Sequence, residues 1–493
     1  MILAIDQGTT STTCIVFDES AEPLGRATIE FAQHFPRPGH VEHDLNEVWA
    51  SVEAAVRESL RSAGAEPADL RAIGITNQRE TVCAWDPLSA APLHRALVWQ
   101  DRRTARRCDE LRDAGHEPLV RERTGLVLDP YFSATKMEWL LDNVDGLRAR
   151  AQDGRAALGT VDAWLLQRLT GEHATDASNA SRTLLYDLQS GAWDADLLTL
   201  FSDLPERALP RIVPSSGVIG TTRGDLFEGA EIPVAGVAGD QQAALFGQAC
   251  LEPGSGKATY GTGSFVLVNV GTAVPAPVEG LLSTVAWGVG RRRDYALEAS
   301  IFVTGAAVQW LRDGLGMIEH AEETAELAGS LESNDGVYFV PALTGLGSPH
   351  WDPYARGTIV GLTRGATRAH FARATLEAIA YQTVDAVRAI EAAGVAPLAE
   401  LRADGGATVN PWLMQFQADV LGVPVVVPEV AETTALGAGY LAGVGVGLWT
   451  LDEVGRSRRE RARYQPQMAE DLRAELLDGW ARALACCRGS ATR

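Results

Sequence analysis

The chain has 493 residues, enough for roughly two to four domains, and 46% of them are apolar, which is ample for large cores. Its formal net charge of −21 argues against nucleic acid as a partner, because binding to a phosphate backbone requires a basic surface. Any anionic ligand must therefore be held by local groups, namely backbone N–H groups, a few arginines or a metal ion.

Basic residues and cysteines carry little signal. Only two of the 43 basic residues are lysines, Lys136 and Lys257, and we interpret this as a compositional habit of the source genome. The six cysteines are scattered without ligand spacing, which predicts neither disulfides nor a metal site and fits a reducing, cytoplasmic location.

Targeting and membrane segments are not expected. The strand pattern begins at residue 2, which leaves no room for a signal peptide. The longest run of apolar residues and glycine, 435–449, is too short to span a bilayer, so we expect a buried helix and no membrane insertion.

Strands and helices alternate along the first half of the chain. Expected strands lie at 2–6, 12–18, 26–32, 70–78, 81–86 and 94–101. An amphipathic helix is expected at 45–64, ending at a glycine, and helices dominate from 101 to about 171. A strand from 232 then delivers Gly239 and Asp240 into the start of a helix.

The pattern restarts after a Pro-Gly-Ser turn within 250–256. A strand–turn–strand unit is expected at 256–271, helices at 304–316 and 370–394, a strand, glycine turn and helix at 401–422, and a further strand at 423–429. Two halves that open alike indicate a duplicated α/β unit, with two unrelated α/β domains as the alternative. We expect domains at 1–250 and 251–445, followed by a packed C-terminal helical segment at 446–493.

The stretch "DQGTTST" (6–12) places an aspartate at the mouth of a turn rich in glycine and hydroxyls. Such a turn can point N–H groups at an anion, and Thr9, Thr10 and Ser11 add O–H donors. Asp6 would repel phosphate unless a cation lay between them, and Mg²⁺ prefers carboxylate, phosphate and water as ligands. The stretch therefore predicts a metal-bridged nucleotide, with an ordinary Asx turn as the alternative.

The stretch "YGTGSF" (260–265) occupies the equivalent place in the second half. Two facing hairpins could clamp a polyphosphate from two sides. Lys257 in "GSGKAT" does not complete a Walker motif, because Leu251 stands where the first glycine belongs and Ala258 follows the lysine.

Asp240 in "GVAGDQQAALFG" stands at the carboxyl end of a strand, where open α/β sheets bind their ligands. A helix N-cap is its alternative role. Gly-Gly in "DGGATVN" (404–410) allows close approach by a flat ligand, and Asn410 could bind an adenine edge; a plain strand-to-helix turn is the alternative.

Three further stretches place polar or aromatic residues after apolar runs. Arg79 and Glu80 in "NQRET" offer five donors beside an acceptor, a pair suited to neighbouring hydroxyls. Trp99 and Tyr131 offer flat walls for a carbon skeleton. Surface ion pairs and core aromatics are the alternatives for these residues.

In this order the stretches resemble the FGGY family of carbohydrate kinases over nearly the whole chain, from Ile2 to about Trp449. The segments concerned are "DQGTTST", "NQRET", "AGDQQAALFGQ", "YGTGSF", "GAAVQWLRD", "LTGLGSPHWDP" and "LGAGYLAG". Sugar-directed members usually carry a Gln-Met-His-Gly type sequence in place of "NQRE", so Arg79 and Glu80 point to glycerol.

The resemblance implies an α/β, actin-like (ribonuclease H-like) ATPase fold, with two duplicated domains around a cleft that closes on MgATP and glycerol. The implied reaction gives sn-glycerol 3-phosphate and ADP. Asp240 matches the catalytic base. The implied glycerol site comprises Arg79, Glu80, Trp99, Tyr131, Asp240, Gln241 and Phe265. The implied nucleotide contacts are Thr9, Thr10, Ser11, Thr262, Gly305, Gln309, Gly406 and Asn410, with Asp6 and Asp240 near the metal.

Three positions depart from the family's pattern. Thr13 stands where many relatives carry arginine, which removes one cationic nucleotide contact. The segment "TTRGDLFEGA" lacks the Gly-Gly-Lys-Gly-Gly-Thr-Arg type sequence that binds fructose 1,6-bisphosphate in some members, and Leu226 stands where others carry a phosphorylatable histidine. We therefore expect neither form of regulation.

The resemblance also suggests a homodimer or homotetramer. Two other hypotheses stay open at this point: an FGGY kinase for another small polyol or sugar, and a non-catalytic actin-like binding or filament protein.

Overall fold

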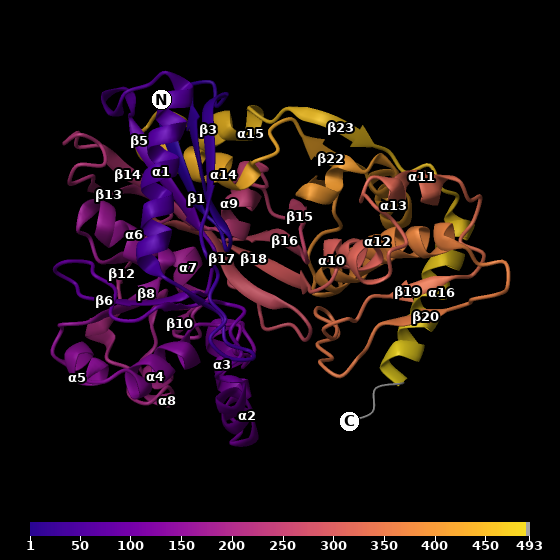
Figure 1. Cartoon of the computed structure of the whole chain (residues 1–493), viewed down its shortest axis with the longest axis horizontal. Coiled ribbons are helices and arrows are strands. Elements are labelled where there is room, and N and C mark those ends of the chain that lie inside the picture. The colour runs from indigo at the N-terminus through magenta and orange to yellow at the C-terminus, as the bar shows by residue number, and fades with distance from the viewer. Residues whose placement is uncertain (490–493) are drawn as a thin grey trace.

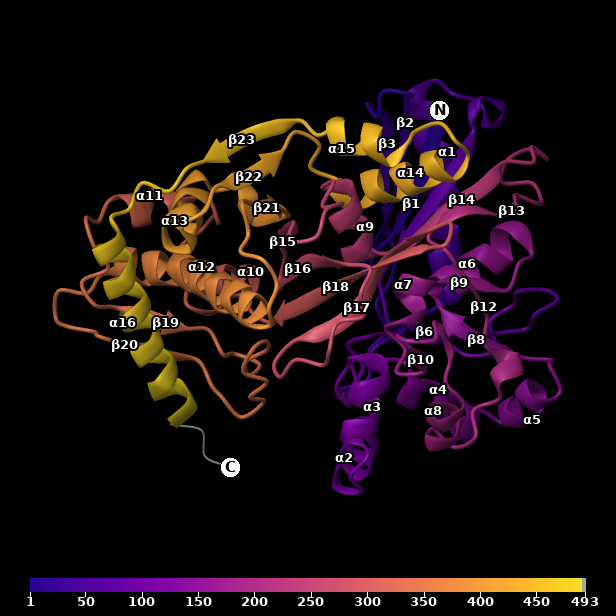
Figure 2. The same cartoon turned by 180° about the vertical axis from the view of Figure 1, so that it is seen from behind.

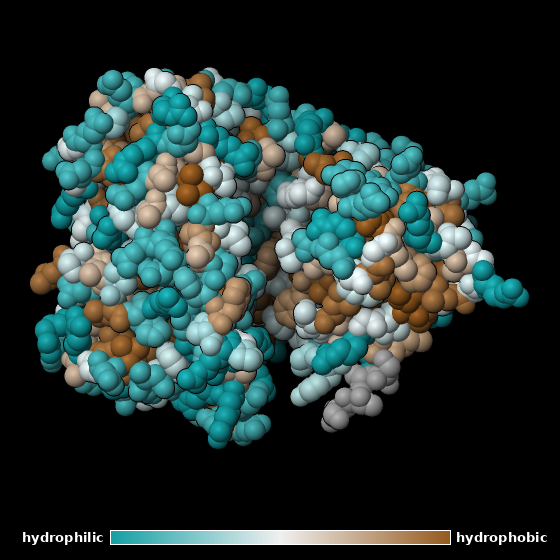
Figure 3. Space-filling model, in the orientation of Figure 1, coloured by the Kyte–Doolittle hydropathy of each residue, from teal (hydrophilic) through white to brown (hydrophobic). Residues whose placement is uncertain are grey.

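The computed structural model describes residues 1–489 and has two lobes joined by one long twisted sheet of 13 strands (Figures 1 and 2). The strand order is β23-β22-β21-β15-β16-β18-β17-β13-β14-β5-β1-β2-β3. Each half of the chain contributes one side of this sheet. Figure 3 shows a deep groove between the two lobes.

The two halves of the sheet are built alike. The first unit contains β1 (Ile2–Gln7), β2 (Ser11–Phe17), β3 (Pro23–Glu30), β5 (Ala72–Asn77) and β14 (Pro233–Gly239). The second contains β15 (Gly256–Tyr260), β16 (Ser264–Gly271), β18 (Arg292–Ile301), β21 (Leu401–Asp404) and β22 (Val425–Pro428).

Pairing follows the same pattern in each unit. The first strand pairs antiparallel with the second, and the second with the third, while the first, fourth and fifth strands run parallel. This shared connectivity confirms the duplicated α/β unit. Between the units, β13 (Ser216–Thr221) meets β17 (Leu282–Val289) at the single register pair Ser216 and Val289.

Some helices cover the faces of the main sheet, and others lie away from it (Figure 1). Those of the first half are α1 (Leu45–Ala63), α2 (Ala105–Asp113), α3 (Glu117–Thr124), α4 (Ala134–Asn143), α5 (Leu147–Gln152), α6 (Val161–Thr170), α7 (Ala177–Ala180), α8 (Ala195–Leu200) and α9 (Asp240–Gly247). Those of the second half are α10 (Gly305–Gln309), α11 (Glu323–Gly329), α12 (Arg368–Ala392), α13 (Pro411–Leu421), α14 (Thr433–Gly445), α15 (Leu451–Arg456) and α16 (Glu470–Gly489).

Helix ends follow their sequence signals. Asp44 caps α1 by accepting a hydrogen bond from the Asn46 N–H, and Gly64 ends the same helix in the left-handed conformation. After α10 the chain continues in a π-helical turn, η3 (Trp310–Gly314). None of the helices within 1–489 has both the length and the apolarity needed to cross a bilayer.

Short strands outside the main sheet complete the architecture. They are β4 (Glu42–His43), β6 (Val82–Trp85), β7 (Ala96–Leu97), β8 (Ala157–Thr160), β9 (Ala174–Asp176), β10 (Tyr186–Asp187), β11 (Ala192–Trp193), β12 (Arg211–Val213), β19 (Tyr338–Val340) and β20 (Thr358–Val360). Two of them, β8 and β9, flank α6 close to the end of the region expected to be mainly helical.

The C-terminal segment expected to be helical also contains a strand. β23 (Glu460–Tyr464) pairs antiparallel with β22 and forms the edge of the main sheet, between α15 and α16. Its sequence, "ERARY", is charged, as exposed edge strands often are. The alternation of apolar and polar residues that predicts a half-buried strand is therefore absent. Residues 490–493 of the expected segment lie outside the described residues.

The buried helix expected at 435–449 is α14, and glycine allows it to pack closely. A Cβ at Gly437 would lie 1.8 Å from the Ala243 carbonyl oxygen of α9. A Cβ at Gly74 of β5 would lie 2.1 Å from the Ala438 carbonyl oxygen of α14. Although α14 comes late in the sequence, it therefore packs against the sheet of the first unit.

Candidate active site

Three parallel strands of the first unit deliver the charged residues of the site. Asp6 lies near the end of β1, Arg79 and Glu80 follow β5, and Asp240 follows β14. Because β5 lies between β1 and β14 in the sheet, with all three running parallel, their carboxyl ends share one edge. Side chains far apart in sequence thereby converge.

Arg79 lies at the centre of this edge, and its side chain is 2% exposed. Its Nε lies 3.1 Å from Oδ1 of Asp240. Its terminal nitrogens donate to the Glu298 carboxylate at 2.5 and 3.2 Å, and one of them lies 3.4 Å from the Tyr131 hydroxyl. One guanidinium thus holds a carboxylate from each half of the chain.

Arg182 completes a buried network of four charges. Its Nε donates to Glu80 at 2.7 Å and its Nη2 donates to Glu298 at 3.0 Å. Glu80 itself adopts a left-handed backbone with φ of 61°, a costly conformation for glutamate that turns the chain sharply after Arg79.

The carboxylates of the network differ in proton affinity. Burial alone would raise the pKa of Glu298, but Arg182 and Arg79 lower it to about 2. The pKa of Glu80 is raised, since burial outweighs the attraction of Arg79 and Arg182. The two arginines therefore favour the ionised form of Glu298 most strongly.

Aromatic rings form a wall beside these charges. The rings of Trp99 and Tyr131 meet edge to face with centroids 5.6 Å apart, and the Arg79 guanidinium lies 5.6 Å from the centroid of Phe265. The Trp99 indole donates to the hydroxyl of Thr9 at 3.0 Å. The site thus pairs an apolar wall with a charged edge, as a polyol with a carbon skeleton and several hydroxyls requires.

Asp6 and Asp240 both have raised pKa values. The pKa of Asp6 is raised to about 7 by burial and by the negative charge of Asp240. Burial also raises the pKa of Asp240, although Arg79, the Gln241 N–H and Lys257 oppose that rise. Asp240 remains the more accessible partner of Arg79, with a side chain that is 33% exposed.

This donor set fits a cation that retains water. Within residues 1–489 no group of three or more His, Cys, Asp and Glu side chains could hold a metal ion by itself. Mg²⁺ commonly binds one or two carboxylates and completes its shell with water and substrate phosphates. Asp6 and Asp240 supply such a pair, and a cation would relieve the repulsion that raises the pKa of Asp6.

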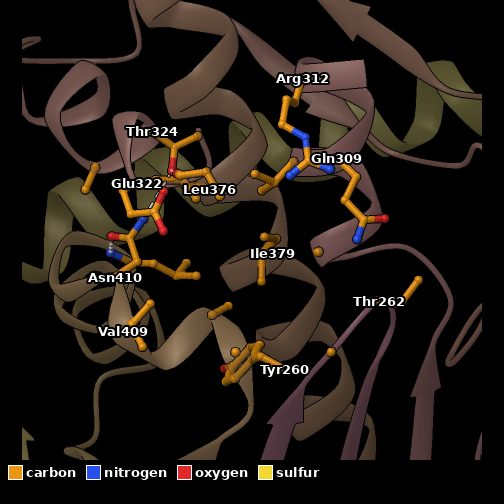
Figure 4. Close-up of a pocket in the computed structure, with 18 of the residues that line it drawn as sticks. Tyr260, Thr262, Gln309, Arg312, Glu322, Thr324, Leu376, Ile379, Val409 and Asn410 are labelled. Carbon is orange, nitrogen blue, oxygen red and sulfur yellow. Dashed lines mark hydrogen bonds between the residues drawn. The ribbon is translucent and has the colours of Figure 1, made fainter. Parts of the chain in front are cut away.

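A separate cavity of about 390 Å³ lies in the second unit. Five residues expected to contact a nucleotide line it: Thr262, Gly305, Gln309, Gly406 and Asn410. Figure 4 shows Asn410, Thr324 and Glu322 on one side, Gln309, Arg312 and Thr262 on the other, and Leu376 and Ile379 between them. Apolar surface with polar groups at its margins suits a purine ring carrying a ribose.

Asn410 caps a helix at the margin of the cavity. Its Oδ1 accepts a hydrogen bond from the Leu413 N–H and caps α13, while its Nδ2 lies 3.3 Å from the Thr324 hydroxyl. Gly305 is required by a close approach, since a Cβ there would lie 2.5 Å from the Gly261 carbonyl oxygen. Both residues line the cavity.

The β15–β16 hairpin links this cavity to the charged edge. Thr262 at its tip lines the cavity, and Phe265, three residues later, lies under Arg79. A ligand extending from the cavity past this tip would therefore reach the neighbourhood of Asp240.

The first hairpin lies on the other side of the site. Thr9 and Thr10 lie in the turn between β1 and β2, Ser11 begins β2, and a hydrogen bond from the Gly8 N–H to the Ser11 carbonyl closes the turn. None of these three hydroxyl residues lines the cavity. Thr13 shares a hydrogen bond with Thr28 of β3 at 2.9 Å. The two hairpins belong to different units, so the structure does not unite all the expected nucleotide contacts in one cavity.

Comparison with known proteins places this architecture in a family. The model of the N-terminal domain of the FGGY family of carbohydrate kinases matches residues 1–247, and that of its C-terminal domain matches residues 256–446. The chain belongs to the FGGY family of carbohydrate kinases.

Several members of the family that are similar to this chain over almost their full length are named glycerol kinase. The glycerol kinase of Deinococcus radiodurans is 54% identical over 491 residues, covering 99% of this chain and 97% of that relative. The glycerol kinase of Dechloromonas aromatica is 55% identical over 487 residues, covering 98% and 96%. The crystal structure of Plasmodium falciparum glycerol kinase with ADP superposes with a TM-score of 0.93 at 35% identity, covering 99% and 98%.

Sugar kinases of the family share the fold at lower identity. The xylulose kinase of Rhodospirillum rubrum has a TM-score of 0.88 at 25% identity, covering all of this chain and 99% of its own. The expected actin-like α/β fold with two duplicated domains is thereby confirmed as that of an FGGY carbohydrate kinase.

Sequence analysis missed two members of the charge network, Arg182 and Glu298. Glu298 stands within the apolar strand "YALEAS", where a lone charge is itself a signal. Arg182 offered no such signal. Its partners lie 102 and 116 residues away along the chain, and only the fold reveals them.

Proposed function

We propose that this chain is a glycerol kinase that transfers the γ-phosphoryl group of ATP to glycerol, giving sn-glycerol 3-phosphate and ADP. The observation that carries the proposal is the juxtaposition of Arg79, Glu80 and Asp240 beside the Trp99–Tyr131 wall. Neighbouring donor and acceptor groups suit adjacent hydroxyls, and flat rings suit a short carbon chain. The names of relatives that are 53–55% identical over almost the whole chain support the same substrate.

Each residue of the acceptor site has a proposed role. Arg79 donates to a hydroxyl, Glu80 accepts from one, and Gln241 contributes its side-chain amide. Trp99, Tyr131 and Phe265 pack against the carbon skeleton. Asp240 is the proposed general base, because a carboxylate facing the acceptor hydroxyl can align it and take its proton.

The nucleotide is proposed to occupy the cavity of the second unit. Gly305, Gln309, Gly406 and Asn410 would contact the nucleoside. Thr262 from one hairpin and the hydroxyls of Thr9, Thr10 and Ser11 from the other would hold the phosphates. Phosphoryl transfer depends mainly on positioning and charge stabilisation, so two hairpins facing one polyphosphate suit the reaction.

Asp6 and Asp240 are proposed to hold Mg²⁺ through carboxylate oxygens and water. When bound, the ion neutralises phosphate charge that these two aspartates would otherwise repel. Its presence would also return Asp6 to the ionised state by stabilising the anion.

We infer several broader properties from family membership. The chain is divided into domains at 1–250 and 251–445 with a C-terminal segment at 446–493, acts in the cytoplasm and forms a homodimer or homotetramer. We propose that it responds neither to fructose 1,6-bisphosphate nor to histidine phosphorylation, and a strong response of its activity to either input would contradict this.

A coupled assay of ADP release across glycerol, erythritol, dihydroxyacetone and xylulose tests the proposal. We expect the highest kcat/KM with glycerol. A higher kcat/KM for another acceptor would assign the chain to a different substrate within the family. An absence of turnover with every acceptor would revive the non-catalytic alternative.

A further inference from the structure

The two lysines of this chain are both buried within reach of the proposed acceptor site. Lys136 and Lys257 are each 0% exposed, whereas most of the chain's basic residues are arginines with substantial exposure. A compositional habit that favours arginine explains why lysines are few. It does not explain why those that remain lie here.

Lys136 joins two parts of the aromatic wall. From α4, its Nζ donates to the carbonyl oxygens of Pro130, of Tyr131 at 3.0 Å and of Phe132 at 3.4 Å, and lies 3.5 Å from that of Trp99. The ammonium thereby connects the backbone of Trp99 to the backbone of Tyr131. These are the two residues whose rings form the wall.

Lys257 fixes the side chain of Gln241. From β15, its Nζ donates to Oε1 of Gln241 and, at 2.7 Å, to the hydroxyl of Thr259. An ammonium has only donors, so it requires the oxygen of the Gln241 amide to face it. The amide NH₂ group then points away from Lys257, and no acceptor within residues 1–489 takes a hydrogen bond from it.

Arginine cannot reproduce either arrangement. At Lys136 several carbonyl oxygens converge on one nitrogen, which a compact ammonium accommodates and a planar guanidinium does not. At Lys257 the Gln241 amide oxygen and the Thr259 hydroxyl likewise converge on one nitrogen. These two positions require the compact ammonium of lysine rather than the planar guanidinium of arginine, which explains why lysine is retained there in a chain that otherwise uses arginine.

We propose that Lys136 and Lys257 are positioning residues of the acceptor site, Lys136 setting the aromatic wall and Lys257 orienting the Gln241 amide so that its NH₂ group donates to a substrate hydroxyl. This inference rests on the proposed function. It adds two residues that act on the substrate through Trp99, Tyr131 and Gln241.

Steady-state kinetics of Lys136→Met and Lys257→Met test the proposal, with kcat, the KM values for glycerol and ATP, and the melting temperature measured together. We expect the glycerol KM to rise about tenfold or more in each variant, as the loss of one well-placed hydrogen bond implies, with the ATP KM within about twofold of wild type. Lys136→Arg and Lys257→Arg should not restore the glycerol KM.

Arg402→Met is the matched control. Arg402 lies opposite Lys257 in the neighbouring strand and reaches the end of α9 through the Gln248 carbonyl at 2.8 Å, whereas Lys257 reaches the start of α9. Its loss should lower the melting temperature and leave the glycerol KM unchanged. A glycerol KM that is unchanged in the lysine variants, or fully restored by arginine, would overturn the proposal.

Two further measurements separate positioning from folding. In a Gln241→Ala background, Lys257→Met should change kcat/KM by less than about threefold, since the residue through which it acts is gone. Fully multiplicative effects would contradict the mechanism. If Lys257→Met does not fold, Gln241→Glu serves instead, because it keeps the acceptor for Lys257 and removes the NH₂ donor. A wild-type glycerol KM in that variant would overturn the assigned orientation.

A failure of the proposed function would be seen in the acceptor preference of the wild-type enzyme, not in the lysine variants. A wild-type enzyme that prefers another acceptor contradicts glycerol as the substrate. The same lysine variants are then measured with the preferred acceptor, for which the proposal makes the same predictions.

Discussion

Arg79 balances the charge of the acceptor site at the scale of single residues. Its Nε faces Asp240, and its terminal nitrogens bind Glu298. Because Glu298 takes two of its N–H groups, Arg79 neutralises Asp240 only in part. Asp240 therefore keeps a basic oxygen while remaining fixed in direction, as a general base requires.

Replacing Asp240 with asparagine should remove proton transfer and leave nucleotide binding intact. We expect kcat to fall by about 10²–10⁴-fold, the usual contribution of a positioned general base. ATP affinity measured without Mg²⁺ should change little, because the cavity residues all come from the second unit. Steady-state kinetics and calorimetric titration with ATP measure the two effects.

Asp162→Asn is the control for that variant. Asp162 is a buried aspartate of the same unit that accepts hydrogen bonds from Thr160 and Thr175 and takes no part in the site. Its replacement should leave kcat within a few-fold of wild type. A near-wild-type kcat in Asp240→Asn would exclude Asp240 as the base.

The ionised Asp6 carboxylate should lower the free energy of unfolding of the ligand-free protein. Its pKa of about 7, against an ordinary value of 3.8, means that the folded state binds the proton more tightly than the unfolded chain. Stability is therefore lost as pH rises between these two values. Asp6→Asn should remove this loss and stabilise the ligand-free protein at pH 8 by up to a few kcal/mol, with little gain at pH 4.

Chemical denaturation of Asp6→Asn and wild type at pH 4, 6 and 8 measures this difference. The same variant should lose most of its kinase activity, since Asp6 is the proposed partner of the metal. A stability difference that does not change with pH would contradict the raised pKa.

The sequence predicted the site residues that follow strands and missed those that reach the site from elsewhere. Asp6, Arg79 and Asp240 stand where apolar runs end, so the rule that ligands bind at the carboxyl ends of strands finds them. Glu298 lies 219 residues from Arg79 along the chain. No local pattern encodes a contact of that separation.

At the scale of elements, close backbone packing joins the two halves of the sequence. α14 lies on α9 and on the sheet of the first unit, and Gly437 and Gly74 stand at two of the close backbone approaches. The glycine-rich sequence predicted a buried helix but could not say which surface it covers. The charged edge strand β23 was missed because its exposed side chains carry no apolar alternation.

Gly437→Ala should separate α14 from α9. The added Cβ would lie 1.8 Å from the Ala243 carbonyl oxygen, so backbone must move, and overpacking of this kind costs about 1–3 kcal/mol or more. Gly439→Ala is the matched control in the same helix, since the nearest neighbours of its Cβ would be side chains rather than backbone, the Phe17 ring at 3.3 Å and Ile2 at 3.8 Å. Urea denaturation should show a lower midpoint for Gly437→Ala and a midpoint near or above wild type for Gly439→Ala, which gains helix propensity. Equal midpoints would contradict the close approach.

At the scale of the whole molecule, the acceptor residues and the nucleotide cavity belong to different lobes. Asp240 and Arg79 come from the first unit, and the cavity is lined by residues of the second. The units share a sheet, yet β13 and β17 connect it through one register pair. A groove runs between the lobes (Figure 3). Relative motion of the units therefore breaks few hydrogen bonds between strands of the main sheet, although Glu298 also links the units through Arg79 and Arg182. We expect this motion to bring the two sites together.

Closure of the lobes should need both ligands. A polyphosphate extending from the cavity can reach Asp240 only when the hairpins of the two units face it together, and closure also excludes the water that would turn a kinase into an ATPase. We expect small-angle X-ray scattering to show a smaller radius of gyration with glycerol and a non-hydrolysable ATP analogue than with either ligand alone.

Gly305→Ala, whose Cβ would lie 2.5 Å from the Gly261 carbonyl oxygen and distort the cavity, should abolish the contraction while leaving glycerol binding intact. A radius of gyration that does not change with both ligands bound would mean that the lobes are already closed and that catalysis needs no domain motion.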